Sequence, residues 1–314
     1  GVPVLEVGRD ADALDVPQRP AQPAVSGADA TWPIRTVLLL WLGDRMAVDT
    51  LALARRATRL PYAVDTGMFV FPNANDDAYA ITLLDSASVR FAERRLAADR
   101  IHDDLLRAML WGALWDLARE ARYAPTRWID VATRALPRLD DEQLVSTILG
   151  RTVRAATRWL GPAQRDSVLP TLEAALARAA DDTTRAYGYR KAHLDALVSV
   201  AATPAALAAL DARLDSATAA GAPLRAPTRW AIVTALVARG APTADRRLAD
   251  ETRRDSTSEG RRRAFVAGAA RPDSATKAAY FRRWFADDAL NEEWVTASLG
   301  AFHAAGQEAL VRPY

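Results

Sequence analysis

The chain contains no cysteine and only three histidines among its 314 residues. The lack of cysteine excludes disulfide bonds, thiol chemistry and cysteine-ligated metal centres. Lysine is almost absent as well, since Lys191 and Lys277 are the only two, so arginine supplies nearly all the positive charge. The 41 basic and 39 acidic side chains nearly cancel, which gives little electrostatic reason to expect a nucleic-acid partner.

Motifs for catalysis and for membrane insertion are also missing. The sequence has no H-E-x-x-H zinc motif, no G-x-x-x-x-G-K-[ST] phosphate loop, no G-x-G-x-x-G fingerprint and no G-x-S-x-G elbow. The histidines, His102, His193 and His303, are too far apart in the sequence for any two to share a helical face. We therefore predict no catalytic residue and no metal ligand on this chain, and interpret the histidines as surface or core residues. The longest apolar run, residues 37–42, is far too short for a membrane span, so no membrane partner is expected.

The first part of the chain has the pattern of a small β-rich domain. Three apolar segments predict strands, at residues 2–7, 34–42 and 46–54. Gly43 and Asp44 separate the last two segments and indicate a hairpin, and residues 66–71 are expected to complete a small antiparallel sheet. An extended, exposed connection after the first strand is predicted by Pro17, Pro20 and Pro23.

From residue 85 onward the pattern is helical. In residues 105–120, apolar side chains recur every three or four positions, which predicts a helix with one stripe facing a core. Prolines stand where several later helices are expected to begin, a position at which the missing N–H costs nothing. Helix N-terminal caps are predicted at Asp85, Thr203, Thr243 and Asp273. Pro170 lies inside a helical run and predicts a kink or a break.

These patterns predict a mainly α fold. Roughly a dozen helices on short loops favour an α-α superhelix, a helical array of the HEAT or armadillo type. A small antiparallel β-sandwich-like domain is expected to precede it. We place the boundary so that the β-rich domain comprises residues 1–76 and the helical superhelical domain comprises residues 77–314.

Acidic pairs and tryptophans have structural interpretations. Several Asp-Asp pairs fall where a helix is expected to begin, and negative charge is favourable there. Trp111 and Trp115 lie four residues apart on one expected helix, and we interpret them as helix-to-helix packing.

The densest basic groups are two short arginine clusters. They comprise Arg261, Arg262 and Arg263 in one cluster and Arg282 and Arg283 in the other. One interpretation is a solvated helix face. The other is that these side chains face the concave side of the helical array and attract peptide carboxylates through charge-assisted hydrogen bonds. The five arginines are thus candidate peptide-chamber residues, and both interpretations stay open.

Three segments, taken in order, carry a likeness to a known family. They read PNANDDAYAITLLD at residues 72–85, LLRAMLWGALWDLARE at residues 105–120 and KAAYFRRWFADDALNEEWVTASLGAFHAAGQEALVRPY at residues 277–314. Together they resemble the C-terminal region of bacterial zinc aminopeptidases of the aminopeptidase N family. The resemblance implies a β-sandwich followed by a bowl-like helical domain that closes over a catalytic domain and limits entry to short peptides.

The resemblance also implies that the chemistry takes place elsewhere. Members of the family bind zinc through H-E-x-x-H and a downstream glutamate, and this chain has no such motif. We therefore expect a C-terminal fragment whose partners are an upstream catalytic domain of the same polypeptide and peptide substrates, with zinc in the intact parent. The alternative is a non-enzymatic helical-repeat scaffold that binds a protein or peptide on its concave face.

Overall fold

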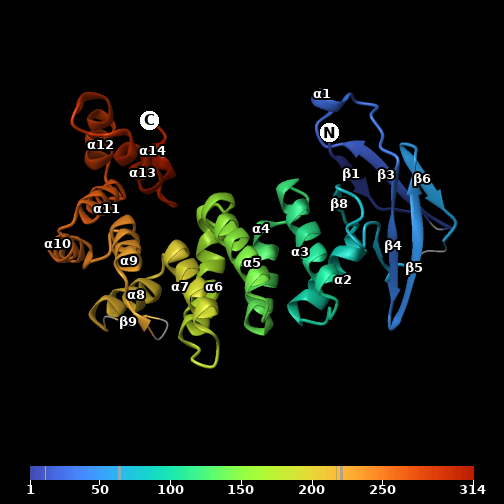
Figure 1. Ribbon diagram of the computed structural model, residues 1–314, viewed down its shortest axis with the longest axis horizontal. Helices are drawn as coiled ribbons and strands as arrows, with labels where there is room; N and C mark the ends of the chain where they lie inside the picture. Colours follow the sequence, from blue (N-terminus) through green and yellow to red (C-terminus); the bar gives the residue numbers. More distant parts are fainter. Residues whose placement is uncertain (11, 63–64, 217, 220–221) are drawn as a thin grey trace. The chain divides into compact units, whose positions relative to one another are not determined.

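The computed structural model describes residues 1–10, 12–62, 65–216, 218–219 and 222–314. Contacts divide the chain into two compact units, Gly1–Leu144 and Val145–Tyr314. Strands β1 to β8 and helices α1 to α4 belong to the first unit, and helices α6 to α14 belong to the second (Figure 1). The predicted fold class, mainly α with a small β part at the start, is confirmed. The boundary after residue 76 stays a prediction, since the first compact unit combines strands with helices.

One sheet of the first unit has five strands. They are β1 (Pro3–Glu6), β2 (Gly8–Asp10), β3 (Ala13–Pro20), β6 (Ala57–Leu60) and β8 (Ile81–Leu83). The sheet follows the order β2-β3-β1-β8, and β6 pairs with β3. All pairs are antiparallel except β1 with β8, which is parallel. Of these five strands only β1 was predicted. Strands β2 and β8 have three residues each and are too short for an alternating pattern to stand out.

The second sheet contains the predicted hairpin. Its strands are β4 (Ile34–Leu42), β5 (Arg45–Leu53) and β7 (Phe69–Phe71), in the antiparallel order β5-β4-β7. The tight turn between β4 and β5 requires a positive φ of 58° at Gly43. The two sheets share one apolar core, formed by Leu5, Val7, Leu14, Val16, Leu38, Leu40, Leu51, Leu53 and Val70. The predicted sandwich is therefore confirmed.

The proline-rich stretch was predicted to be an exposed connection, and that prediction is wrong. Pro17 and Pro20 lie in β3, where the chain is extended but every second side chain is buried. Pro20 shares the buried phase with Leu14 and Val16, so the pyrrolidine ring contributes to the interior. The third proline, Pro23, begins the short helix α1 (Pro23–Ser26).

A buried asparagine shapes the turn between β7 and β8. The side-chain oxygen of Asn73 accepts hydrogen bonds from the Thr36 hydroxyl at 2.8 Å and from the backbone N–H of Ala78 at 3.1 Å. Its side-chain nitrogen donates to the Ala78 carbonyl at 2.9 Å. The amide therefore closes this turn and ties it to β4. This network explains why an asparagine follows Pro72 in the first of the three family-like segments.

The first long helix, α2 (Ser86–Ala97), starts at the predicted cap Asp85. The Asp85 carboxylate accepts from the backbone N–H groups of Ala87 and Ser88 at 2.8 and 3.1 Å. It also pairs with Arg9 of β2 at 3.0 Å. Burial raises the pKa of Asp85, but the hydrogen bonds from Arg9 and Ser88 outweigh it and hold the pKa below its usual range. The helix start is thereby bound to the sandwich.

Three tryptophans pack the next helices together. The elements are α3 (Asp104–Arg119), α4 (Pro125–Ala135), the 3-10 turn η1 (Leu136–Arg138) and α5 (Glu142–Arg154). The Trp128 ring of α4 meets the rings of Trp111 and Trp115 edge-on, with centroids 5.2 and 5.0 Å apart. This geometry confirms the packing interpretation of the tryptophans.

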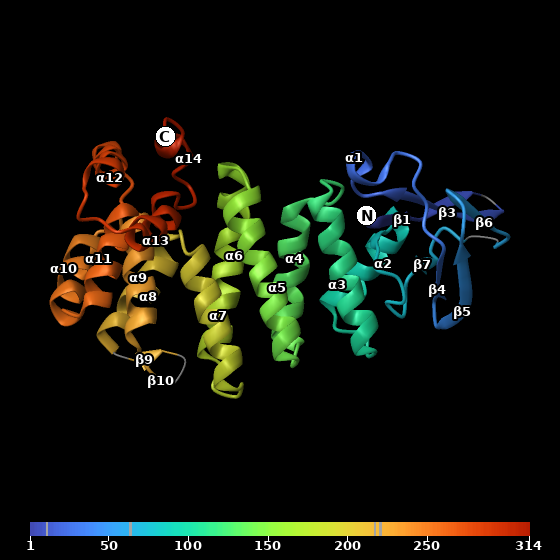
Figure 2. The ribbon, with the colours of Figure 1, turned by 45° about the horizontal axis from the view of Figure 1, so that its top comes forward.

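The second unit is an array of helices in two layers (Figure 2). Its elements are η2 (Ala155–Trp159), α6 (Pro162–Asp181), α7 (Tyr187–Val200), α8 (Pro204–Ser216), β9 (Thr218–Ala219), β10 (Ala222–Pro223), α9 (Ala226–Ala238), α10 (Ala244–Arg254), α11 (Ser258–Ala269), α12 (Ser274–Ala286), α13 (Glu292–Phe302) and α14 (Glu308–Val311). Helix α7 packs against α9, α9 against α11, and α11 against α13, which forms one row. Helices α6, α8, α10 and α12 pack against members of this row. Such pairing of consecutive helices is typical of helical repeats.

Two of the three caps predicted in this unit are present. Thr203 and Asp273 accept hydrogen bonds, at 3.2 and 2.7 Å, from backbone N–H groups three residues further on. The cap predicted at Thr243 is wrong. The hydroxyl of Thr243 donates to the Asp211 carboxylate of α8 at 2.9 Å instead, and no side-chain cap bond forms at this end of α10.

Helix α6 runs unbroken through Pro170, so of the kink or break predicted there the break does not occur, and the kink stays a prediction. Proline inside a helix removes one backbone hydrogen bond, and α6 nevertheless extends over 20 residues. Among the helices described, none combines the length and the apolar character that a bilayer crossing would need.

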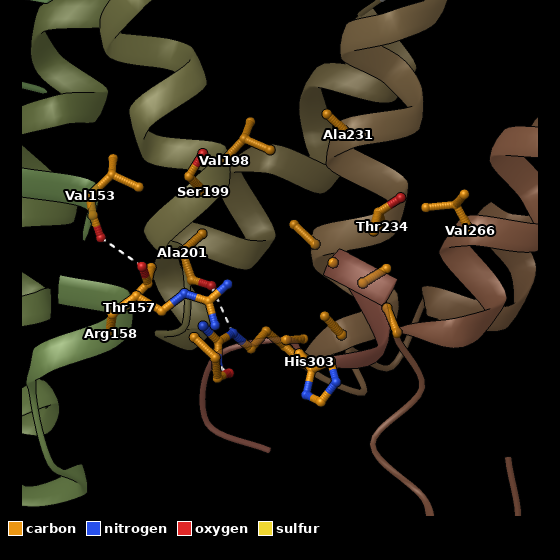
Figure 3. Close-up of a pocket in the computed structure, with 18 residues that line it drawn as sticks. Val153, Thr157, Arg158, Val198, Ser199, Ala201, Ala231, Thr234, Val266 and His303 are labelled. Carbon is orange, nitrogen blue, oxygen red and sulfur yellow. Dashed lines mark hydrogen bonds between the residues drawn. The ribbon is translucent and has the colours of Figure 1, made fainter. Parts of the chain in front are cut away.

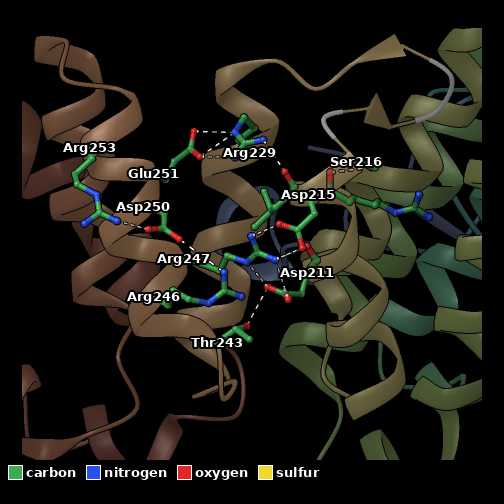
Figure 4. Close-up of polar contacts among 12 residues, drawn as sticks. Asp211, Asp215, Ser216, Arg229, Thr243, Arg246, Arg247, Asp250, Glu251 and Arg253 are labelled. Atoms are coloured by element: carbon green, nitrogen blue, oxygen red, sulfur yellow. Dashed lines mark hydrogen bonds and ion pairs between the residues drawn. The ribbon is translucent and has the colours of Figure 1, made fainter.

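Buried arginines join α8, α9 and α10 (Figure 4). Arg247 of α10 lies between two aspartates of α8, with its Nε 2.7 Å from Asp211 and its Nη1 2.6 Å from Asp215. These hydrogen bonds raise the pKa of Arg247 and lower those of both carboxyl groups. Arg229 of α9 makes a second buried pair with Glu251 of α10, with Nη2 2.7 Å from the carboxylate. Each buried guanidinium group has a carboxylate partner. These ion pairs offset the cost of burying the charges of Arg229 and Arg247.

Candidate functional site

A groove lies along the row of helices in the second unit. It consists of two adjoining hollows of about 500 and 600 Å3. The two hollows share Thr157, Arg158, His303 and Ala304. We call the two together the groove. Figure 3 shows the first hollow, which is lined by residues of η2, α7, α9, α11 and α13 and of the ends of neighbouring helices.

Small side chains keep the groove open. Its first hollow is lined by Ala201, Ala231, Ala235, Ala238, Ala270, Gly300, Ala301, Ala304 and Ala305. Val153, Val198 and Val266 add larger apolar surface to the same wall. A lining of this kind suits an extended chain with small or apolar side chains, because close approach to the helix backbones is possible.

The hydroxyl groups of the groove are occupied by the helices themselves. Thr157, Ser199 and Thr234 each donate to the carbonyl four residues earlier, at 2.7, 2.8 and 2.7 Å. An activated nucleophile needs its proton taken by a neighbouring base. These three hydroxyls give their protons to backbone carbonyls, so none of them is arranged as an activated nucleophile.

Helices α7, α9, α11 and α13 end beside the groove, and polar side chains donate to carbonyls at or just beyond these ends. Arg239 donates from Nε to the Ala201 carbonyl at 3.1 Å and from Nη1 to the Ala305 carbonyl at 2.6 Å. Buried Gln307 donates to the carbonyls of Ala238 and Ala270 at 2.7 and 2.8 Å. Burial lowers the pKa of Arg239. The positive charge of Arg239 lies at the negative ends of helices and stabilises them. Its hydrogen bonds to carbonyls give this side chain a structural role.

Gly306 allows Arg239 to reach across the helix ends. Its φ is +86°, a value that favours glycine. A Cβ at this position would lie only 2.8 Å from Nη1 of Arg239. The connection from α13 to α14 therefore favours glycine for its backbone conformation, and the missing Cβ leaves room for the guanidinium of Arg239.

Lys277 joins the ends of α11 and α13 from inside the unit. Its ammonium group donates to the carbonyls of Ala269 and Phe302, both at 2.8 Å, and lies 4.9 Å from the centre of the Phe302 ring. The side chain is fully buried. Burial lowers the pKa of Lys277 to about 8, and the charge of Asp273 only partly offsets this effect.

Arg158 is a groove-lining cation that the fold does not use. It is exposed, and within the described part of the chain it has neither a hydrogen bond nor an ion pair. In Figure 3 its side chain extends from η2 toward Ala201, with His303 on another wall. Arg312 and His303, which line the second hollow, are likewise exposed.

The acidic residue of the groove is already neutralised. Glu308 lines the second hollow and pairs with Arg165 at 2.6 Å. The hydrogen bond from Arg165 lowers the pKa of Glu308 to about 2. With this pair cancelled, the remaining charge at the described surface of the groove is positive.

The predicted chamber arginines do not line the groove. Arg262 and Arg263 both pair with Glu259 of their own helix, at 2.6 and 2.8 Å. Arg261 donates to the Ser256 carbonyl at 2.8 Å, and Arg283 pairs with Asp287 at 2.7 Å. Arg282 is exposed. Their role in peptide contact stays a prediction.

The three histidines occupy separate environments. His193 is buried, its Nδ1 is 2.8 Å from the Tyr189 carbonyl, and burial lowers its pKa. His102 and His303 are exposed. Among the described residues, no group of three or more histidine, aspartate or glutamate side chains could hold a metal ion. The side chains described here therefore do not fit a zinc site.

Arg158 was not predicted as a site residue, because no motif in the neighbouring sequence distinguishes it. It lies outside the arginine clusters, and the rest of its wall comes from helices far along the chain. Residues 151–159 contain three arginines, and only the fold shows that Arg158 is the one that lines the groove.

Comparison with known proteins places this architecture in a family. A family model described as the ERAP1-like C-terminal domain matches residues 69–314. Aminopeptidase N of Streptomyces lividans is 30% identical over 281 residues, which cover 87% of this chain and 31% of that protein. The chain thus spans less than a third of the length of this relative. The match to the family model begins at β7 and continues through all of the helices that line the groove, and the chain belongs to the ERAP1-like C-terminal domain family.

Proposed function

We propose that this chain is the C-terminal wall of a substrate chamber in a zinc aminopeptidase, an enzyme that removes N-terminal residues from peptides. Its family membership and its similarity to an aminopeptidase N support this proposal. The chain covers 31% of that relative, so the proposed chemistry belongs to sequence outside the 314 residues. In this role the chain would limit access to the chamber and shield it from bulk solvent.

The proposed zinc ion would be held by an upstream catalytic domain of the same polypeptide. The described residues supply no suitable cluster of metal ligands. Zinc in such enzymes polarises the scissile carbonyl and activates water. The part of this chain would be to hold the substrate while that chemistry takes place.

The groove is the proposed contact for the peptide beyond its N-terminal residue. The observation that carries this proposal is the unpaired guanidinium of Arg158 at the edge of an apolar, alanine-lined surface. A guanidinium can form two parallel hydrogen bonds with a carboxylate. The C-terminal carboxylate of a peptide, or an acidic side chain, would therefore be attracted to this position. The five clustered arginines remain separate candidates for contacts with a longer peptide.

Direct binding of peptides tests this proposal. An apolar fluorescent peptide with a free C-terminal carboxylate should bind the chain more tightly than the same peptide as an amide. The variant Arg158→Gln should weaken binding of the carboxylate form by about tenfold and reduce the preference for it over the amide. Arg154→Gln is the matched control, because Arg154 is exposed on the preceding helical turn and does not line the groove.

Two results would refute the role of Arg158. One is equal affinity for the acid and the amide in the unchanged protein. The other is an equal loss of affinity in Arg158→Gln and Arg154→Gln, which would indicate a general charge effect.

A further inference from the structure

The first unit has a hollow of its own, formed where the end of α2 meets the turn of the hairpin. Its volume is about 380 Å3. Three arginines line it, namely Arg94, Arg95 and Arg100, together with Asp44 as the single acidic residue and Gly43, Gly67 and Phe91. We call this the arginine pocket. It belongs entirely to the unit Gly1–Leu144 and is separate from the groove.

These arginines are not needed to complete the end of α2. The N–H of Asp99 donates to the Leu96 carbonyl at 3.1 Å, and the N–H of Arg100 donates to the Arg95 carbonyl at 2.8 Å. Asp99 has a φ of 51°, so the chain ends the helix in a Schellman motif. Because the backbone already satisfies these carbonyls, the guanidinium groups remain available.

One of the three arginines is held in place by aromatic rings. The guanidinium carbon of Arg95 lies 4.5 Å from the centre of the Trp41 ring and 5.2 Å from that of Phe91. Its hydrogen bond to the Gly43 carbonyl is long, at 3.5 Å. Stacking therefore fixes the group without using up its donors.

The other two arginines have no partner among the described residues. Arg94 and Arg100 are exposed and make neither an ion pair nor a side-chain hydrogen bond there. Arg262 and Arg263 show the usual alternative, since both use the neighbouring Glu259. Three cations thus face one hollow that contains a single carboxylate.

We propose that the arginine pocket binds a phosphate-type oxyanion. A tetrahedral phosphate carries a larger negative charge than a carboxylate and presents its oxygens in more directions, so it is better suited to accept hydrogen bonds from three guanidinium groups at once. Gly43 leaves room for the anion, since a Cβ added there would meet no atom within 4 Å. This site is independent of the proposed peptidase role.

Titration of the 314-residue chain with inorganic phosphate, at constant ionic strength set with chloride, tests the proposal by calorimetry. Saturable binding of one phosphate is expected, with acetate binding more weakly by at least about tenfold. The double variant Arg94→Gln/Arg100→Gln should raise the Kd for phosphate by at least about tenfold. Both side chains are exposed and unpaired, so the far-ultraviolet circular dichroism of the variant should match that of the unchanged protein.

Arg90→Gln is the control, because Arg90 is an exposed arginine on the same helix that does not line the pocket. It should leave the Kd for phosphate unchanged. Absence of saturable phosphate binding would overturn the proposal. So would an equal loss in the control and in the double variant, or an affinity for acetate equal to that for phosphate.

Discussion

Asn73 illustrates how single buried polar residues determine local structure in this chain. The side chain is fully buried, and both its oxygen and its nitrogen are hydrogen-bonded. Removing it would leave the Thr36 hydroxyl and two backbone groups of Ala78 without a partner in the interior. Unsatisfied buried groups cost more than the loss of an exposed contact.

We expect Asn73→Ala to lower the free energy of unfolding by about 2 to 4 kcal/mol. Asn75→Ala, at an exposed position of the same turn, should change it by less than about 0.5 kcal/mol. Urea denaturation followed by circular dichroism measures both values. Equal effects of the two substitutions would contradict the role assigned to the buried amide.

Lys277 makes stability depend on pH in an unusual direction. Burial lowers its pKa from 10.5 to about 8, so the folded state releases the proton at a lower pH than the unfolded state. Between these values unfolding takes up a proton, and the contribution of this residue to stability rises with pH. Below about pH 8 both states carry the charge, and the contribution no longer changes.

The difference in unfolding free energy between the unchanged protein and Lys277→Met should therefore increase from about pH 8 to about pH 10.5. Urea denaturation at several pH values measures this difference. Lys191→Met provides the comparison, since Lys191 is partly exposed and pairs with Asp195. A difference for Lys277→Met that stays level or falls with pH would count against the account.

At the scale of helices, cross-linking by arginine joins neighbours that the sequence does not mark as partners. Arg247 of α10 binds two carboxylates of α8, and it is buried while its neighbour Arg246 is exposed. Loss of a buried cation between two carboxylates leaves both without their partner. A surface ion pair contributes little by comparison.

Arg247→Ala should destabilise the protein by about 2 to 4 kcal/mol. Arg246→Ala, which removes only an exposed pair with Asp250 at 3.8 Å, should cost less than about 1 kcal/mol. Thermal and urea unfolding of the two variants gives the comparison. If both variants unfolded alike, the network around Arg247 would have no special structural role.

The same scale shows what could be read from the sequence. Asp85 and Asp273 were predictable caps because a cap depends on neighbours within three residues. Thr243 was not, since its partner Asp211 lies 32 residues earlier in the chain. The prediction that Pro20 is exposed was wrong for a related reason. Packing against the opposite sheet determines which side chains of β3 are buried. Contacts between residues close in the sequence were predictable, and contacts with residues far along the chain were not.

At the scale of the whole molecule, the fold class could be predicted from the helix and strand patterns, and the family from three segments in the right order. The residues of the candidate site could not be predicted from the sequence. The predicted arginine clusters pair mainly with their own helices, whereas Arg158 became a candidate only through the convergence of several helix ends. A groove is a property of the packed array, so its lining cannot be inferred from clusters along the sequence. The proposed role of the chain therefore rests on family membership together with this surface.

Kinetics of the full-length gene product test the central claim most directly. If the groove holds the distal part of a peptide, Arg158→Gln should raise KM for an extended peptide by about tenfold with little change in kcat. Hydrolysis of an aminoacyl-4-nitroanilide, which has no distal peptide part for the groove to hold, should be unchanged. An equal effect on both substrates, an unchanged KM for the peptide, or a gene product without aminopeptidase activity, as expected of a binding scaffold, would contradict the account.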